Sequence, residues 1–231
     1  GDRPENLIWV MPAEGNNMAF THAVIFTGGD SPNPNVLTHL VDGALVIAAD
    51  SGYGHAQSLG MQPHLLVGDM DSIADSDVAD ARDRNVEIHT YDVAKDETDT
   101  EIAVSCAIQR GVTNITVVSG GGDRFDHLLG MVHSLAATQC SLYVGNAHIC
   151  FARPDAPCSL SVPIGEVISL IPLGGSSVIS TTRLQWNLAN EELQAFASRG
   201  VSNIATHTKI SVTVTHGSVA IIQPFSLGGN K

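Results

Sequence analysis

The fold is decided by residues 45–72, which read LVIAADSGYGHAQSLGMQPHLLVGDMDS. This stretch starts with an apolar run at 45–49, continues with a short helical pattern at 54–59, and ends with a second apolar run at 65–67. Asp50 follows the first run and Gly68 the second, and both residue types are typical of strand ends. A strand, a helix and a second strand in this order indicate a right-handed crossover between parallel strands.

The same alternation extends on both sides of this unit. Apolar runs at 22–27, 86–91, 115–118 and 141–144 predict further strands, and helical patterns occupy 35–41, 98–109 and 124–137. Thr98 with Glu101 three residues later forms a capping box, so we expect a helix to begin there. We therefore predict an α/β domain with a mostly parallel sheet over residues 21–145, after an N-terminal extension over residues 1–20.

Beyond residue 145 the pattern changes from alternating elements to strands alone. Runs rich in β-branched residues lie at 166–171, 177–182, 209–216 and 218–223, and residues 209–215 alternate between apolar and polar. His216 and Gly217 are expected to form the turn of a hairpin. We predict a C-terminal antiparallel β-sandwich over residues 146–231.

The charge is distributed unevenly along the 231 residues. The net charge is −13, and residues 1–145 hold 20 of the 24 acidic residues. With only three lysines, the chain is not expected to bind nucleic acid through its phosphates. No run of eighteen apolar residues is present, so we expect no membrane span. Without a signal-peptide pattern and with four cysteines that show no metal spacing, we expect a cytoplasmic protein with reduced thiols.

Acidic residues collect where the predicted strands end or helices begin. These are Asp50, Asp69, Asp71, Asp96, Asp99, Glu101 and Asp126. Asp69 and Asp71 are two residues apart, so an extended segment would point both to one side. Such carboxylates repel unless a cation lies between them, and oxygen ligands without His or Cys favour Mg²⁺. The alternative is that these are solvated loop residues, which fits one aspartate better than four at successive strand ends.

A glycine-rich segment follows the strand at 115–118. Backbone N–H groups of Gly121 and Gly122 before a helix could bind an anion, and Arg124 could add a bidentate contact to phosphate. A plain turn is the alternative. Lys95, among acidic residues, is expected either to contact a phosphate beside the metal or to form a surface ion pair. Neither GxxxxGK[ST] nor GxGxxG is present, so a nucleotide would need a different site.

Taken in order, several motifs resemble those of thiamin pyrophosphokinases. They are Thr27-Gly28-Gly29, Ala49-Asp50-Ser51-Gly52, Gly68-Asp69-Met70-Asp71-Ser72, the segment from Lys95 to Glu101, and the segment 121–127, which reads Gly-Gly-Asp-Arg-Phe-Asp-His. The resemblance continues more loosely through residues 168–174 and 184–188 and at Ser202-Asn203. It departs from the family pattern at Arg183, where glycine is expected, and at Ile204, where an acidic residue is expected.

The resemblance implies an activity and a division of labour. It implies a homodimer that transfers the β,γ-pyrophosphoryl group of ATP to the hydroxyl of thiamin, with Mg²⁺, releasing AMP. The α/β domain would bind ATP and carry out catalysis, and the β-sandwich would bind thiamin and form the dimer. No nucleic acid or membrane partner is implied.

The resemblance also assigns candidate residues to this chemistry. Asp69, Asp71 and Asp96 or Asp99 would hold Mg²⁺, Lys95 and Arg124 would offset developing charge, and Asp99 could accept the proton of the hydroxyl. The catalytic set is therefore Asp71, Lys95, Asp99 and Arg124. The ATP-binding set would be Asp50, Gly52, Gly121, Gly122, Arg124, Asp126 and His127, although His127 could instead have a buried capping role.

For thiamin, the resemblance points to Trp186, Ser202 and Asn203. Trp186 would stack on the partly cationic ring, and Ser202 and Asn203 would bond the pyrimidine across a dimer interface. A core position in the sandwich is the alternative for Trp186.

Two other functions are compatible with parts of the sequence. The segment 69–72 after an apolar strand also resembles haloacid-dehalogenase-like phosphatases, in which the residue at the position of Asp69 is phosphorylated. A non-catalytic protein that binds thiamin or a nucleotide is the third possibility.

Overall fold

The computed structural model describes residues 20–70, 73–91, 96–122 and 124–225. Its first part is a parallel sheet in the order β6-β5-β1-β2-β3-β4. The strands are β1 (His22–Phe26), β2 (Leu45–Ala49), β3 (Leu65–Gly68), β4 (Glu87–Thr90), β5 (Asn114–Ser119) and β6 (Cys140–Val144). The predicted parallel α/β fold is confirmed.

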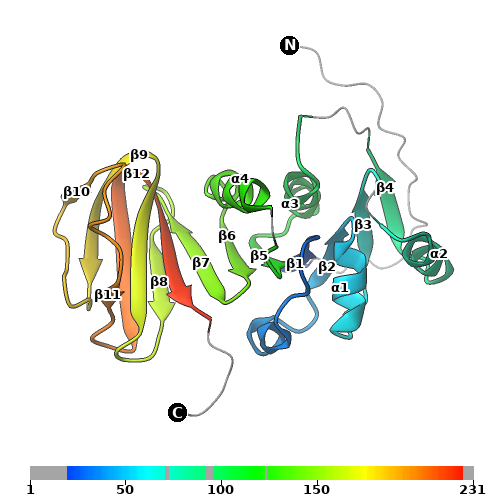
Figure 1. Cartoon of the computed structure of the whole chain (residues 1–231), viewed down its shortest axis with the longest axis horizontal. Coiled ribbons are helices and arrows are strands. Elements are labelled where there is room, and N and C mark those ends of the chain that lie inside the picture. The colour runs from blue at the N-terminus through cyan, green and yellow to red at the C-terminus, as the bar shows by residue number, and fades with distance from the viewer. Residues whose placement is uncertain (1–19, 71–72, 92–95, 123, 226–231) are drawn as a thin grey trace.

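Helices cover both faces of this sheet (Figure 1). They are the 3₁₀ helix η1 (Pro34–His39), α1 (Gly52–Ser58), α2 (Asp75–Asp83), α3 (Asp99–Gln109) and α4 (Phe125–Leu135). Ile25 and Ile47 pack in the core with α3, whereas Val24 and Val46 pack on the opposite side with residues of η1 and α1. Because both faces are buried, the central strands read as continuous apolar runs instead of alternating ones.

The second part of the chain continues the same sheet with antiparallel strands. These are β7 (Ala147–Ala152), β8 (Cys158–Ser161), β9 (Val167–Thr182), β10 (Glu191–Leu193), β11 (Asn203–Ile204) and β12 (Lys209–Pro224). Strand β7 pairs with β6, and β12 pairs with β7, β8 and β9. A separate apolar core that includes Ile168, Ile179 and Val212 lies within this part. The architecture fits the predicted two-part fold, and the boundary at residue 145 stays a prediction.

The hairpin predicted at His216 and Gly217 is wrong. Both residues lie inside the single strand β12, which runs from Lys209 to Pro224 and keeps pairing with β9 across two register shifts near His216. The positive φ of Gly217 (83°) and its close approach to Ser177 belong to this irregularity. Glycine at positive φ serves a bulge as well as a turn, so the local sequence could not separate them.

Likewise, the strands predicted at 166–171 and 177–182 are parts of one strand, β9, which contains Gly174 and Gly175. Strands β7 and β8 had no clear sequence signal.

All four cysteines are free, as expected. Within the part of the chain that the structure describes, no helix is long and apolar enough to cross a membrane.

Candidate active site

The carboxyl ends of β1, β2, β3 and β5 meet at one edge of the parallel sheet, where ligands bind in folds of this class. The loops after β1 and β5 are joined there by backbone hydrogen bonds. The N–H of Thr27 donates to the carbonyl of Val118 (3.0 Å), and the N–H of Asp30 donates to the carbonyl of Gly121 (3.1 Å). A side chain on Gly29 or Gly120 would overlap the backbone of the opposite loop. These glycines therefore allow the two loops to touch.

The glycine-rich loop after β5 offers fewer donors to an anion than its sequence suggests. The N–H of Gly121 donates to the hydroxyl of Ser119 (3.2 Å), a buried residue at the end of β5. Gly121 and Gly122 both have positive φ angles, 90° and 143°. Gly122 is exposed, so it is the member of the predicted pair that is better placed to meet a ligand.

Asp50 lies at the centre of this edge, directly after β2. It is only 9% exposed and has a φ of 47°, which is uncommon for a residue other than glycine. Its N–H donates to the carbonyl of Val67 (2.9 Å). Its carboxylate lies so close to Gly68 that a side chain there would overlap it. The fold thus places the Asp50 carboxylate against the residue that precedes Asp69.

Gly52 has a packing role that accounts for its identity. A methyl group at this position would overlap the carbonyl oxygen of Phe26 and lie 2.9 Å from the nitrogen of Thr27. Helix α1 therefore begins in direct contact with the end of β1. This close packing holds the loop that contains Asp50, and contact between Gly52 and ATP remains a prediction.

Two further candidates lie at or just before the start of α3. Thr98 is the N-cap: its N–H donates to the Glu101 carboxylate (2.8 Å), and its hydroxyl accepts from the N–H of Glu101 (3.3 Å). The predicted capping box is confirmed, and it engages the carboxylate of Glu101. Asp99 is the first residue of the helix and is half-buried, and Asp96 is exposed. Asp71 and Lys95 lie outside the described residues.

Arg124 and Asp126 form a bidentate ion pair at the start of α4. The guanidinium nitrogens Nε and Nη2 lie 3.0 Å and 2.7 Å from the two carboxylate oxygens of Asp126. The hydrogen bond from Arg124 holds the pKa of the Asp126 carboxyl well below its usual range. Both side chains are exposed, so the pair contributes little stability and can open to a ligand. His127 is exposed too, and its predicted alternative as a buried cap is wrong.

At the far end of the sheet, Asn203 holds the loop that carries Trp186. Its Oδ1 accepts from the N–H groups of Trp186 (3.2 Å) and Ile204 (2.9 Å), and its Nδ2 donates to the carbonyl of Trp186 (2.8 Å). Trp186 itself is 56% exposed, which contradicts the alternative of a core position. Ser202 is exposed, with a φ of 62°. The sequence did not indicate that Asn203 holds the Trp186 loop, because this clamp, the set of hydrogen bonds from the Asn203 amide, joins segments 17 residues apart.

Family models match two consecutive regions of the chain. Residues 37–144 match "Thiamin pyrophosphokinase, catalytic domain", and residues 158–219 match "Thiamin pyrophosphokinase, vitamin B1 binding domain". The chain belongs to the thiamin pyrophosphokinase family. This membership does not favour the phosphatase alternative or the non-catalytic one.

Individual relatives agree with this family. The thiamine pyrophosphokinase of Bacillus subtilis (strain 168) is 28% identical over 102 residues, which are 44% of this chain and 48% of the relative. The match thus spans about half the length of that curated protein. A crystal structure of thiamine pyrophosphokinase from Bacillus subtilis has a TM-score of 0.78 at 21% identity and covers 89% of this chain and 100% of its own. Thiamin pyrophosphokinase from Candida albicans has a TM-score of 0.72 at 14% identity, with 97% of each chain covered. These structures show the shared fold.

The donor set of this thiamin pyrophosphokinase family member fits magnesium. Within residues 20–70, 73–91, 96–122 and 124–225, no three His, Cys, Asp or Glu side chains form a ready-made metal cluster. Mg²⁺ does not need one, since it usually takes one or two carboxylates and completes its shell with water and phosphate oxygens. Asp69, beside Asp50, and Asp99 are carboxylates of the required kind.

An apolar groove lies next to the glycine-rich loop and was not expected from the sequence. It has a volume of about 490 Å³ and separates α4 from the antiparallel strands, with Phe125, Leu129, Val132, Leu173 and Ile222 among its lining residues. Phe125 is 69% exposed and Leu129 is 46% exposed. The spacing of apolar residues on α4 could have indicated one apolar face, but such a face is normally expected to be buried.

Proposed function

We propose that this protein transfers the β,γ-pyrophosphoryl group of ATP to the hydroxyl of thiamin, giving thiamin diphosphate and AMP. The observation that carries the proposal is the carboxyl edge of the parallel sheet, where Asp50 packs against Gly68 just before Asp69. The match of both the catalytic and the vitamin B1 binding family models supports the two substrates.

In this proposal Asp69, Asp71 and Asp96 or Asp99 hold Mg²⁺. The metal would neutralise charge on the triphosphate of ATP and align its phosphates. Asp50 and Gly52 define the floor of the nucleotide site, and Gly121 and Gly122 form its side. An acidic protein can bind a polyanion in this way because its carboxylates hold the metal that contacts the phosphates.

Cationic side chains would complete the phosphate site. Arg124 can exchange its exposed pair with Asp126 for contacts to phosphate oxygens, since a guanidinium carries five N–H donors. Asp126 and His127, on the first turn of α4, would then orient the phosphates or the ribose. We propose Lys95 as a second phosphate contact and Asp99 as the group that accepts the proton of the thiamin hydroxyl.

For thiamin, the exposed Trp186 supplies an aromatic face for a partly cationic ring. Ser202, which directly precedes Asn203, is exposed and could bond the pyrimidine. Asn203 was predicted to bond the pyrimidine, but we give it a different role. Both ends of its amide are bonded to the loop backbone, so it acts by positioning Trp186.

A homodimer would bring these two halves of the site together. Strands β9 and β10, which flank the Trp186 loop, lie at the opposite end of the sheet from β3 and β4 (Figure 1). We therefore propose that the Trp186 loop of one chain serves the carboxyl edge of its partner. The apolar groove beside α4 provides surface that such a partner could cover. We place the enzyme in the cytoplasm, where its free thiols would stay reduced.

The deciding experiment is an incubation of the purified protein with ATP, Mg²⁺ and thiamin. We expect thiamin diphosphate and AMP in equal amounts, and no product when the metal is chelated. Formation of ADP with thiamin monophosphate would contradict pyrophosphoryl transfer.

The thiamin contact can be tested separately through Trp186→Phe. A smaller aromatic face should raise KM for thiamin about tenfold while KM for ATP changes little. Steady-state kinetics with each substrate varied in turn measures this. An unchanged KM for thiamin would refute stacking on Trp186.

A further inference from the structure

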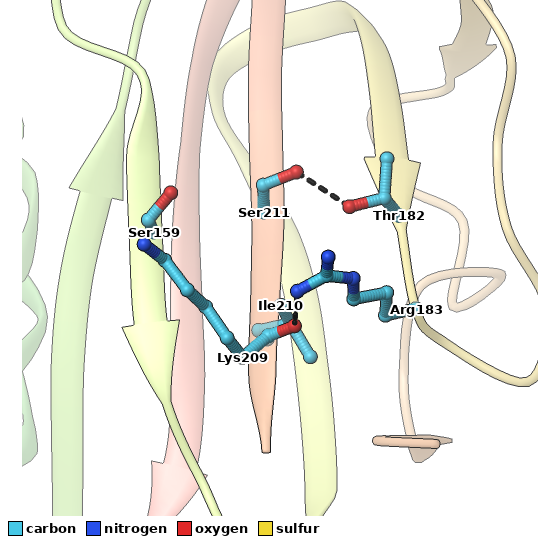
Figure 2. A pocket seen from close by; sticks show the side chains of 6 residues that line it. All are labelled: Ser159, Thr182, Arg183, Lys209, Ile210 and Ser211. Atoms are coloured by element: carbon cyan, nitrogen blue, oxygen red, sulfur yellow. Dashed lines mark hydrogen bonds between the residues drawn. The ribbon is translucent and has the colours of Figure 1, made fainter. Parts of the chain in front are cut away.

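A row of hydroxyl groups crosses three neighbouring strands on the solvent face of the antiparallel sheet (Figure 2). Ser211 of β12 is paired directly with Ser159 of β8 and with Thr182 of β9. The hydroxyls of Thr182 and Ser211 are 2.6 Å apart. The neighbouring residue Ile210 points the other way into the core and is 1% exposed. The row is therefore a fixed part of the sheet surface.

Two cationic side chains flank this row. Figure 2 shows the ammonium group of Lys209 on the Ser159 side and the guanidinium of Arg183 on the Thr182 side. The Nη1 of Arg183 donates to the carbonyl of Lys209 (3.3 Å), which holds the guanidinium over β12. Together the six residues Ser159, Thr182, Arg183, Lys209, Ile210 and Ser211 line a hollow of about 370 Å³.

None of these six lining residues, all of which the structure describes, is acidic. Of the four acidic residues in the antiparallel part, Asp155 pairs with Arg153 (2.8 Å) and Glu191 pairs with Arg199 (2.5 Å). Among the described residues, neither Arg183 nor Lys209 forms an ion pair. The chain has a net charge of −13, so acidic residues outnumber basic ones. Two cations that share one hollow without an acidic partner therefore stand apart from the rest of the chain.

The backbone at Arg183 supplies an independent argument. Its φ is 63°, in the left-handed region that disfavours residues with a side chain. Glycine would adopt this conformation without strain. The backbone strain at Arg183 thus accompanies a guanidinium that lines the hollow, a combination that makes Arg183 a candidate binding residue.

We propose that this hollow binds a phosphate group, either as inorganic phosphate or as part of a small phosphate ester. A tetrahedral oxyanion has enough acceptor oxygens for the guanidinium, the ammonium group and the hydroxyls of the row. The site lies on β8, at the end of β9 and on β12, and it shares no residue with the carboxyl edge of the parallel strands or with Trp186, Ser202 and Asn203. The inference therefore does not depend on the proposed transfer reaction.

Isothermal titration of the full-length protein with inorganic phosphate tests the proposal. The double variant Arg183→Gln/Lys209→Gln should bind about tenfold more weakly or not at all, because it loses both charge-assisted contacts. Arg199→Gln, which removes another exposed arginine of the antiparallel part, should bind as the original does. Absence of binding to the original protein, or unchanged affinity in the double variant, would overturn the proposal.

Two further variants separate the alternatives. Arg183→Gly should unfold at a higher temperature, because the strain at φ 63° is relieved, yet bind phosphate more weakly. Arg124→Gln should leave the affinity for phosphate unchanged, and loss of binding in this variant would assign the phosphate to the carboxyl edge instead.

Titration with glycerol 2-phosphate identifies the source of the phosphate group: tighter binding than inorganic phosphate favours an ester. Equal displacement by chloride at matched ionic strength would indicate a non-selective counter-ion site and overturn the proposal.

Discussion

Gly52 is the residue at which the packing of α1 against β1 is most sensitive to size. Its neighbours are backbone atoms, the carbonyl oxygen of Phe26 and the nitrogen of Thr27, and backbone atoms cannot rotate away as a flexible side chain can. Any added side chain must therefore displace either the helix or the strand end. Either displacement would move the loop that carries Asp50.

Gly52→Ala should destabilise the protein by about 2 kcal/mol or more, because the new methyl group overpacks a rigid contact. Urea unfolding measures this. Gly54→Ala is the matched control in the same helix: its methyl group would meet only the Asp77 side chain, at 3.2 Å. The control should be neutral or slightly stabilising, since alanine favours a helix over glycine. Equal stability losses in the two variants would show that the contact with β1 does not matter.

Among the elements, α3 depends on its capping box for the position of its first turn. Thr98 and Glu101 satisfy backbone N–H groups that have no partner within a helix, and Asp99 lies between them. The same first turn therefore determines where the Asp99 carboxylate points.

Thr98→Ala should cost about 1 kcal/mol of stability, as is usual for the loss of an N-cap. If Asp99 acts in the site, kcat should fall further than the small unfolded fraction explains. Thr100→Ala, in the same turn without a capping role, serves as the control for both measurements. A Thr98→Ala protein with full kcat and unchanged stability would contradict the role of the cap.

Strands β7 and β12 hold a histidine whose charge the fold disfavours. His148 stacks on Tyr143 at 4.3 Å between ring centroids, and its Nδ1 is 2.8 Å from Nε2 of Gln223. Burial, with a smaller contribution from His39, lowers the pKa of His148 to about 4. The unfolded chain, with an ordinary pKa of 6.5, binds the proton more readily. Stability from neutral His148 is thus present above pH 6.5 and is lost as the pH falls towards 4.

His148→Phe should flatten this acid dependence. It keeps an aromatic ring against Tyr143 but cannot take up a proton. The original protein should lose up to roughly 3 kcal/mol more than the variant between these two pH values. Urea unfolding at a series of pH values measures it, with the exposed His207→Gln as the control. Parallel pH profiles for the original and His148→Phe would exclude His148 as the source.

At the scale of the whole molecule, the proposed homodimer with its shared site predicts that two damaged chains can complement each other. Asp69→Asn should inactivate the proposed metal site, and Trp186→Ala should weaken the proposed thiamin site. Each mixed dimer of these chains would contain one site with both original residues. Coexpression should therefore restore about one quarter of the original activity. Activity no higher than the average of the two variants would place Asp69 and Trp186 of one site in the same chain.

Much of the fold and part of the site follow from short-range patterns. The apolar runs of β1, β2 and β3, alternating with helical patterns, predict a parallel sheet whose two faces are covered by helices. The Thr98 cap is determined within four residues. The aspartates after β2 and β3 are predicted to be neighbours because parallel strands end at one edge.

Other features depend on residues that meet only after folding. Gly217 belongs to a bulge and not to a turn because β9 lies beside it throughout, and the exposure of Trp186 depends on the Asn203 clamp 17 residues away. The hollow between Arg183 and Lys209 exists because β8, β9 and β12 align Ser159, Ser211 and Thr182. The sequence by itself determined the strands of the parallel part and where the acidic residues follow them, since these depend on neighbours within a few residues. Only the tertiary structure decided how long strands pair, which loops touch and which cations lack acidic partners, because those contacts join residues far apart in the chain.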